Sequence, residues 1–114
     1  MTDDSLSLLR GTVDLLILKS LTWEAKHGYA ISEWIDGVTE GTLLMEEGTL
    51  YPALHRLARK GWIEAEWGLS DNNRRAKFYQ LTAAGRGRLD SEATSWQRYS
   101  EAVARALAMS GPHP

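Results

Sequence analysis

Apolar residues recur every three or four positions in four stretches of the chain, a spacing typical of helices that bury one face. The four predicted helices span residues 6–21, 29–38, 47–60 and 83–108. Pro52 is acceptable only near a helix start, so it places the beginning of the third helix within residues 47–49. Lys60 followed by Gly61 is a stop signal for that helix, and Thr82 is a capping residue for the last one.

Between the third and fourth helices, apolar and polar residues alternate, as in strands with one buried face. Residues 62–67 alternate in this way, and residues 76–81 form the expected partner strand. The connection between them holds glycine, serine, aspartate and the pair Asn72–Asn73, all of which favour turns. The predicted protein is therefore mainly α with a small β-hairpin, in the order of a winged helix-turn-helix followed by one further helix. Most of the five tryptophans are expected in its core.

The first and last helices carry more apolar surface than one small domain usually covers. The first has a second apolar stripe, and the last repeats apolar residues every seven positions. Helices exposed in this way would leave a large apolar patch, which indicates packing between two copies of the chain. The predicted dimer interface comprises Leu8, Leu15, Leu18, Leu89, Trp96 and Val103.

Charge is distributed unevenly along the chain. The net charge is −2, but residues 55–88 hold eight Lys and Arg against three acidic residues, whereas residues 1–54 hold three basic and nine acidic residues. A domain whose cations gather on one structural unit can bind a polyanion despite a low net charge. A solvated charged surface is the other interpretation, and composition alone does not separate the two.

The third helix and the hairpin carry the predicted DNA contacts. Thr49, at the helix start, is expected to cap the helix, to receive a phosphate, or both. Tyr51, His55 and Arg56 are expected on its outer face, and at least one of Arg56 and Arg59 is expected to reach a base or a phosphate. For Tyr51 the alternative is packing against the second helix, and for the arginines it is solvated charge. Three closely spaced hairpin cations are the predicted phosphate ligands: Arg74, Arg75 and Lys77.

Catalytic and cofactor-binding patterns are missing from the sequence. His27, His55 and His113 do not have the spacing of metal ligands, and no phosphate-binding loop, nucleophile elbow or dinucleotide fingerprint occurs. There are no cysteines, which excludes disulfides and thiolate chemistry. No apolar run approaches the roughly 18 residues that span a bilayer, and the acidic start differs from a secretory signal. We expect a cytoplasmic protein with no enzymatic activity, metal, cofactor or membrane segment.

Four segments of the chain resemble the PadR family of bacterial transcriptional regulators: LLRGTVDLLILKSL, HGYAISEWI, EEGTLYPALHRLARKGWI and NNRRAKFYQLTAAGR. The resemblance covers residues 6–96, and the block GTLYPALHRLARKGWI is its most specific part. One helix after the hairpin is similar to the smaller branch of the family. That branch implies a homodimer in which the last helix packs on the first and last helices of the other subunit. The resemblance also implies that Tyr29 points to the DNA backbone and that a small, often aromatic, molecule releases a repressor.

These observations lead to one expected function and its alternatives. We expect residues 1–81 to be a DNA-binding domain, 82–109 a dimerisation helix and 110–114 a disordered tail. The dimer would be a repressor that binds double-stranded DNA at a palindromic operator. The expected site for an aromatic effector comprises Trp96, Leu8, Tyr99 and Val103, although Trp96 could be an interface anchor only. A winged-helix module for protein interaction and an aromatic-ligand-binding dimer are the alternatives.

Overall fold

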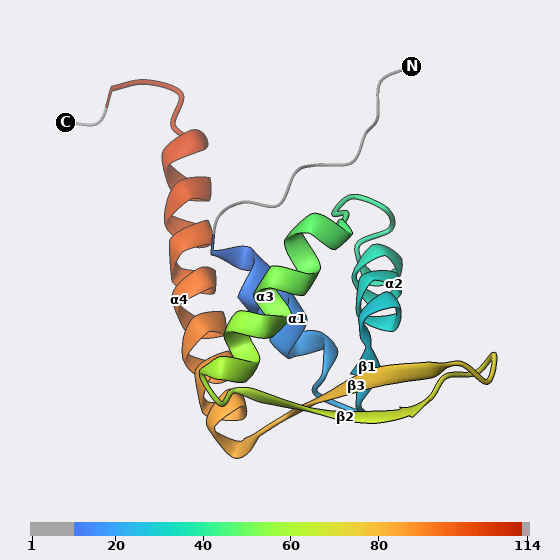
Figure 1. Ribbon diagram of the computed structural model, residues 1–114. Helices are drawn as coiled ribbons and strands as arrows, with labels where there is room; N and C mark the ends of the chain where they lie inside the picture. The colour runs from blue at the N-terminus through green and yellow to red at the C-terminus, as the bar shows by residue number, and fades with distance from the viewer. Residues whose placement is uncertain (1–10, 113–114) are drawn as a thin grey trace.

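The computed structural model describes residues 11–112 and has the predicted order of elements with one added strand (Figure 1). The elements are α1 (Thr12–Ser20), β1 (Lys26–His27), α2 (Gly28–Val38), α3 (Glu47–Arg59), β2 (Ile63–Leu69), β3 (Arg75–Leu81) and α4 (Ala83–Leu107). Leu8 lies outside the described residues, so the parts of the interface and effector predictions that involve it are untested. The predicted disorder of residues 110–114 is likewise untested. None of the described helices is long and apolar enough to cross a membrane.

The core lies between α1, α2 and α3, and the first part of α4 closes it. Its largest fully buried apolar side chains are Ile17, Leu18, Ile31, Ile35, Leu50, Leu54, Leu57 and Ile63. Full burial of each such side chain stabilises the fold by about 1.5–3 kcal/mol relative to exposure.

Leu18 was predicted on a stripe that faces a second subunit, and this prediction is wrong. Its side chain is 0% exposed, because α1 contacts α2, α3 and α4 and therefore buries more than one face within its own subunit. Leu89 is also buried inside the subunit, whereas Leu15 is half-buried against the core. Of the predicted interface residues, Trp96 and Val103 keep substantial exposed surface.

The sheet has three antiparallel strands in the order β1-β3-β2. No strand was predicted between the helices 6–21 and 29–38, but Lys26 and His27 pair with Tyr79 and Phe78 of β3. A strand of two residues shows no alternation, so the pattern of apolar positions could not reveal it. The predicted hairpin is present, and β2 pairs with β3 from Ile63↔Leu81 to Leu69↔Arg75. The two long strands form the wing, and β1 ties the wing to the start of α2.

Local signals in the sequence explain where the wing turns and where α3 and α4 meet it. Asn73 adopts a positive φ of 60°, which asparagine tolerates better than most residues, and its N–H donates to the Ser70 carbonyl. Gly61 takes φ 78° after α3, and the Trp62 N–H then donates to the Leu57 carbonyl at 3.1 Å, as in a Schellman motif. The Thr82 hydroxyl accepts from the Gly85 N–H at 3.0 Å, which confirms the predicted cap of α4.

The predicted cap at the start of α3 is wrong. Glu46 occupies the capping position without a side-chain hydrogen bond, and its carbonyl accepts from the backbone N–H groups of Thr49 and Leu50. The Thr49 side chain is exposed in the first turn, one turn too late to cap the helix. The Thr49 N–H donates to the Glu46 carbonyl, so the predicted phosphate contact would fall to the exposed Thr49 hydroxyl.

The tryptophans differ from the core positions predicted for most of them. Trp23, Trp67 and Trp96 are exposed, and Trp34 and Trp62 are half-buried. Trp23, Trp62 and Trp67 each have a Lys or Arg side chain over the ring. Cation–π contacts of this kind hold a large ring at the surface beside charge rather than inside the core.

Candidate nucleic-acid interface

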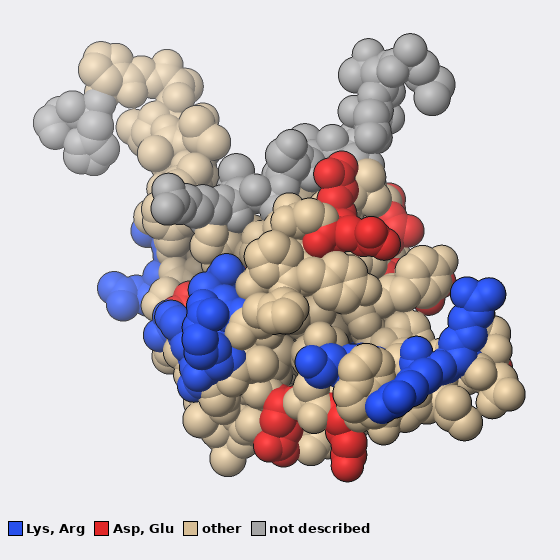
Figure 2. All heavy atoms as spheres, viewed as in Figure 1, with Lys and Arg blue, Asp and Glu red and all other residues tan. Residues whose placement is uncertain are grey.

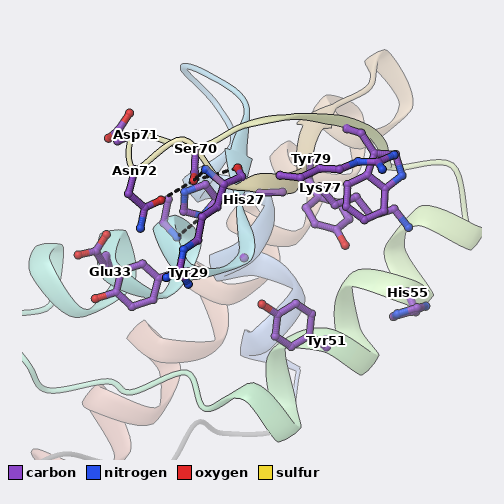
Figure 3. A pocket seen from close by; sticks show the side chains of 16 residues that line it. His27, Tyr29, Glu33, Tyr51, His55, Ser70, Asp71, Asn72, Lys77 and Tyr79 are labelled. Atoms are coloured by element: carbon purple, nitrogen blue, oxygen red, sulfur yellow. Dashed lines mark hydrogen bonds between the residues drawn. The ribbon is translucent and has the colours of Figure 1, made fainter.

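A groove of about 790 Å³ lies between the start of α2, the outer face of α3 and the wing (Figure 3). Six of the predicted DNA-binding residues line it, Tyr29, Tyr51, His55, Arg74, Arg75 and Lys77, whereas Thr49, Arg56 and Arg59 do not. They come from three elements that are far apart in the sequence. The fold therefore brings the predicted helix contacts and the predicted hairpin cations to one surface.

The cations of this groove come from the wing. Figure 2 shows Lys and Arg gathered along the wing, while acidic side chains gather over the start of α3 and the loop before it. Glu33 of α2 and Asp71 of the wing turn also line the groove, so its charge is mixed but positive on balance. Positive charge at a groove raises the local concentration of a polyanion and supplies ligands for phosphates.

Arg56 was predicted to face outward towards DNA, and this prediction is wrong. Its guanidinium donates a hydrogen bond to the Asp14 carboxylate on α1, with which it forms an ion pair. The reason is angular, because successive helix residues point about 100° apart, which turns Arg56 from the His55 face towards α1. Arg59 is exposed and follows His55 by one helical turn, so it lies on the same face as Tyr51 and His55. Of the two arginines, only Arg59 lies on the outer face of α3.

The start of α2 is built by a histidine cap. His27 Nδ1 accepts a hydrogen bond from the Ala30 N–H at 3.1 Å and so satisfies one of the free backbone N–H groups at the helix start. The ring edge also packs against Phe78 of β3, with 5.3 Å between centroids. The cap and this contact hold the first turn of α2 against the sheet, and Tyr29 projects from that turn as an exposed side chain at the groove.

Tyr51 packs against α2 and remains available at the groove. It is 41% exposed, and a Cβ built on Gly28 would lie only 2.7 Å from its hydroxyl oxygen and 3.0 Å from its ring. The two interpretations offered for Tyr51, packing on the second helix and contact with DNA, are therefore compatible. Glycine at position 28 allows this close approach of ring and backbone.

Gly28→Ala is expected to weaken DNA binding by about tenfold, because the new methyl group displaces the Tyr51 ring, and one base-reading contact is worth about 1–3 kcal/mol. Thermal stability should change little, since Tyr51 can rotate outward. The matched control is Gly37→Ala in the same helix, where an added Cβ meets nothing within 4 Å. Fluorescence anisotropy with a labelled duplex measures both variants. Equal affinity of Gly28→Ala and the parent protein would remove Tyr51 from the interface.

Tyr79 and Trp67 also line the groove, although neither was predicted to bind DNA. Burial of Tyr79, and secondarily the nearby Tyr51, raises the pKa of its phenol above the ordinary value. The hydroxyl is therefore protonated at neutral pH and able to donate a hydrogen bond. Strand alternation places Trp67 and Tyr79 on the same face of the wing, the face at the groove. This alternation was the sequence signal that could have identified both residues.

A second cleft, of about 470 Å³, lies between the start of α1 and the middle of α4. Leu15, Trp96 and Tyr99 line it, and the two aromatic rings lie 6.1 Å apart between centroids. Val103 is exposed two turns further along α4 and does not line this cleft. Two of the four residues predicted to bind an aromatic effector are therefore brought together, while Leu8 lies outside the described residues.

Comparison with known proteins places this geometry in context. Residues 17–91 match the model of the transcriptional regulator PadR-like family. An uncharacterised protein of Lysinibacillus sphaericus is 33% identical over 97 residues, which cover 84% of this chain and 88% of the relative. The structure of a transcriptional regulator from Clostridium thermocellum superposes with a TM-score of 0.76 at 29% identity, covering 84% of this chain and 93% of that one. A PadR family transcription regulator from Clostridium difficile gives a TM-score of 0.72 at 28% identity, covering 85% and 99%.

Proposed function

The chain belongs to the PadR-like family and is a DNA-binding transcription regulator, and from this premise we propose that it acts as a homodimeric repressor on a palindromic operator. The observation that carries the proposal is the groove in which α2, α3 and the wing present their side chains together. Its chemistry suits duplex DNA, because cations line one side and groups able to contact base edges line the other.

In the proposed complex, α3 lies in the major groove. Its 13 residues make a helix about 20 Å long. An α-helix with its side chains is about 10–12 Å in diameter, and it fits the major groove, which is about 12 Å wide. Tyr51, His55 and Arg59 then face base edges. Tyr29, Thr49 and the wing cations Arg74, Arg75 and Lys77 contact phosphates on either side. Phosphate contacts set the register of the protein on the duplex, and base contacts select the sequence.

The proposed dimer uses the projecting half of α4. Figure 1 shows α4 extending beyond the body formed by α1, α2 and α3. This half carries four exposed large apolar or aromatic side chains, Trp96, Tyr99, Val103 and Leu107. A helix that exposes such a stripe is stabilised when another copy covers it. Leu15 at the cleft extends this surface onto α1, whereas Leu18 and Leu89 belong to the core.

The experiment for this proposal is His55→Ala. Loss of a base-reading side chain should cost about 1–3 kcal/mol and relax the preference at one position of each half-site, with the salt dependence of binding unchanged. Binding to a library of operator variants measures the preference. The control is Arg56→Gln, which breaks the ion pair with Asp14 and should lower stability without altering base preference. A change of preference in the control and none in His55→Ala would contradict the proposed docking of α3.

A second proposal concerns control by a ligand. The cleft with Trp96 and Tyr99 suits a planar aromatic molecule, because stacked rings gain about 0.5–1.5 kcal/mol beyond the burial of area. Such a ligand would release DNA only if it preferred a subunit arrangement that misplaces the recognition helices. Titration of Trp96 fluorescence, in a variant whose other tryptophans are phenylalanine, tests this. No quenching and no DNA release across a panel of planar compounds would leave Trp96 as an interface anchor.

A further inference from the structure

The wing exposes two large apolar side chains that phosphate binding does not explain. Trp67 is 58% exposed and Leu69 is 67% exposed, although both belong to a paired strand. Strand alternation and the pairs Trp67↔Lys77 and Leu69↔Arg75 place them on the same face as two of the wing cations. Trp67 lines the groove, and Leu69 is two residues closer to the tip. Neither side chain packs in the core of the subunit.

The two faces of the wing differ in charge. Face-sharing positions on the groove side carry Trp67, Leu69, Arg75 and Lys77, whereas Glu64 and Glu66 alternate onto the opposite face. Glu64 accepts a hydrogen bond from Gln80 there at 2.9 Å. Apolar surface and positive charge are therefore gathered on one face. A partner for that face has to offer both an apolar interior and a border of negative charge.

The cations and the indole form one unit. The Arg75 guanidinium carbon lies 4.6 Å and the Lys77 ammonium nitrogen 5.9 Å from the Trp67 ring centroid. The negative face of the Trp67 ring attracts both cations and keeps them close together despite their like charge. The turn beyond is also fixed, since the Ser70 N–H donates to the Arg74 carbonyl at 2.8 Å and the Ser70 hydroxyl bonds Asn72. These contacts restrain the wing turn and the Trp67 ring, which reduces the conformational freedom that is lost on binding.

We propose that Trp67 and Leu69 are an apolar wedge that enters the minor groove of bound DNA and partly unstacks one base-pair step. Arg75 and Lys77 hold the phosphates that border the step. The minor groove supplies the required combination, because the faces of two neighbouring bases are apolar once the step between them opens, and phosphates border the groove. Side chains that open a base step in this way bend the duplex. The inference rests on the proposed function, since it assumes that α3 occupies the adjacent major groove.

The test uses the full chain and an operator duplex with a fluorescent donor and acceptor at its two ends. Trp67→Ala and Leu69→Ala should each bind about 10- to 100-fold more weakly, the range expected for loss of one aromatic or apolar contact with a base. Energy transfer should show a bent duplex with the parent protein and a straighter one with either variant. Trp67→Phe, which keeps a ring, should restore most of the affinity and the bend.

The salt dependence separates the wedge from a positioning role. Loss of an apolar contact leaves the slope of log affinity against log salt unchanged, whereas loss of phosphate contacts makes it shallower. The matched control is Trp23→Ala, which removes another exposed indole with a lysine over its ring at 4.9 Å, one that does not line the groove. This control should bind and bend DNA as the parent protein does. Circular dichroism checks folding, and Leu69→Ala carries the test if Trp67→Ala fails to fold.

Three results would overturn the inference. The first is a shallower salt slope in Trp67→Ala, which would mean that the ring only orients the cations. The second is a straight duplex with the parent protein. The third is unchanged affinity in both alanine variants. Failure of the parent protein to bind any duplex would instead remove the proposed function itself. Because a straight but tightly bound duplex contradicts only the wedge, the two failures are distinguishable.

Discussion

Gly85→Ala is expected to destabilise the protein by about 3 kcal/mol, although alanine is the better helix former. A Cβ at position 85 would lie 2.0 Å from the Trp62 carbonyl oxygen and 2.9 Å from a methyl carbon of Leu81. The first of these atoms belongs to the backbone, and the Trp62 carbonyl also accepts from the Thr82 N–H, so it cannot simply rotate away. The first turn of α4 would have to separate from the wing, which would disturb both elements.

The matched control is the same substitution two residues further along α4. A Cβ at Gly87 meets nothing within 4 Å, so Gly87→Ala should stabilise the helix by about 0.5–1 kcal/mol. Urea denaturation followed by circular dichroism measures both changes. Shifts of opposite sign are the expected result. Equal shifts for the two variants would show that α4 does not press on the Trp62 backbone.

Removal of the wing charges should have the second large effect, in this case on binding. The variant Arg74→Gln, Arg75→Gln, Lys77→Gln should bind every duplex at least about 100-fold more weakly at low salt, since each lost phosphate contact removes a charge-assisted hydrogen bond. The slope of log affinity against log salt should become shallower by about three units. The ranking of different operator sequences should stay the same, because phosphates carry no base information.

A control with the same change in net charge separates local contacts from overall charge. Lys19, Arg98 and Arg105 are exposed and do not line the groove. Arg98 follows Trp96 by two positions and Arg105 follows Val103 by two, and this spacing turns both arginines away from the proposed dimer interface. Their triple substitution by glutamine should leave the salt slope nearly unchanged. If it lowered the slope as much as the wing variant did, the groove would have no special role in phosphate binding.

The sequence predicted most of the fold because its signals are local. Gly61, Asn73 and Thr82 end or begin elements through backbone geometry that these residue types favour, and each occupies the expected position. The order of helices and long strands followed from the period of apolar residues. The two-residue strand β1 did not, because its pairing with β3 depends on segments about 50 residues apart in the sequence.

Predictions about which neighbour covers a side chain were less successful. Leu18 was predicted to face a second subunit and Arg56 to face DNA, but the position of α1 buries Leu18 in the core and pairs Arg56 with Asp14. Trp67 follows strand alternation correctly, yet no core exists beneath the outer wing to bury it. Periodicity defines a face, whereas tertiary packing decides whether protein, solvent or DNA covers it.

Binding of a homodimer to a palindromic operator is tested by selection of bound duplexes from a random library, followed by sedimentation of the complex formed on the selected sequence. A homodimer with two recognition helices should select an inverted repeat whose half-sites lie one helical turn, or a multiple of it, apart, and two chains should bind each duplex. Substitution of His55 should then relax the same position in both halves. Selection of a single non-palindromic site bound by one chain, or no selection at all, would contradict the proposed function.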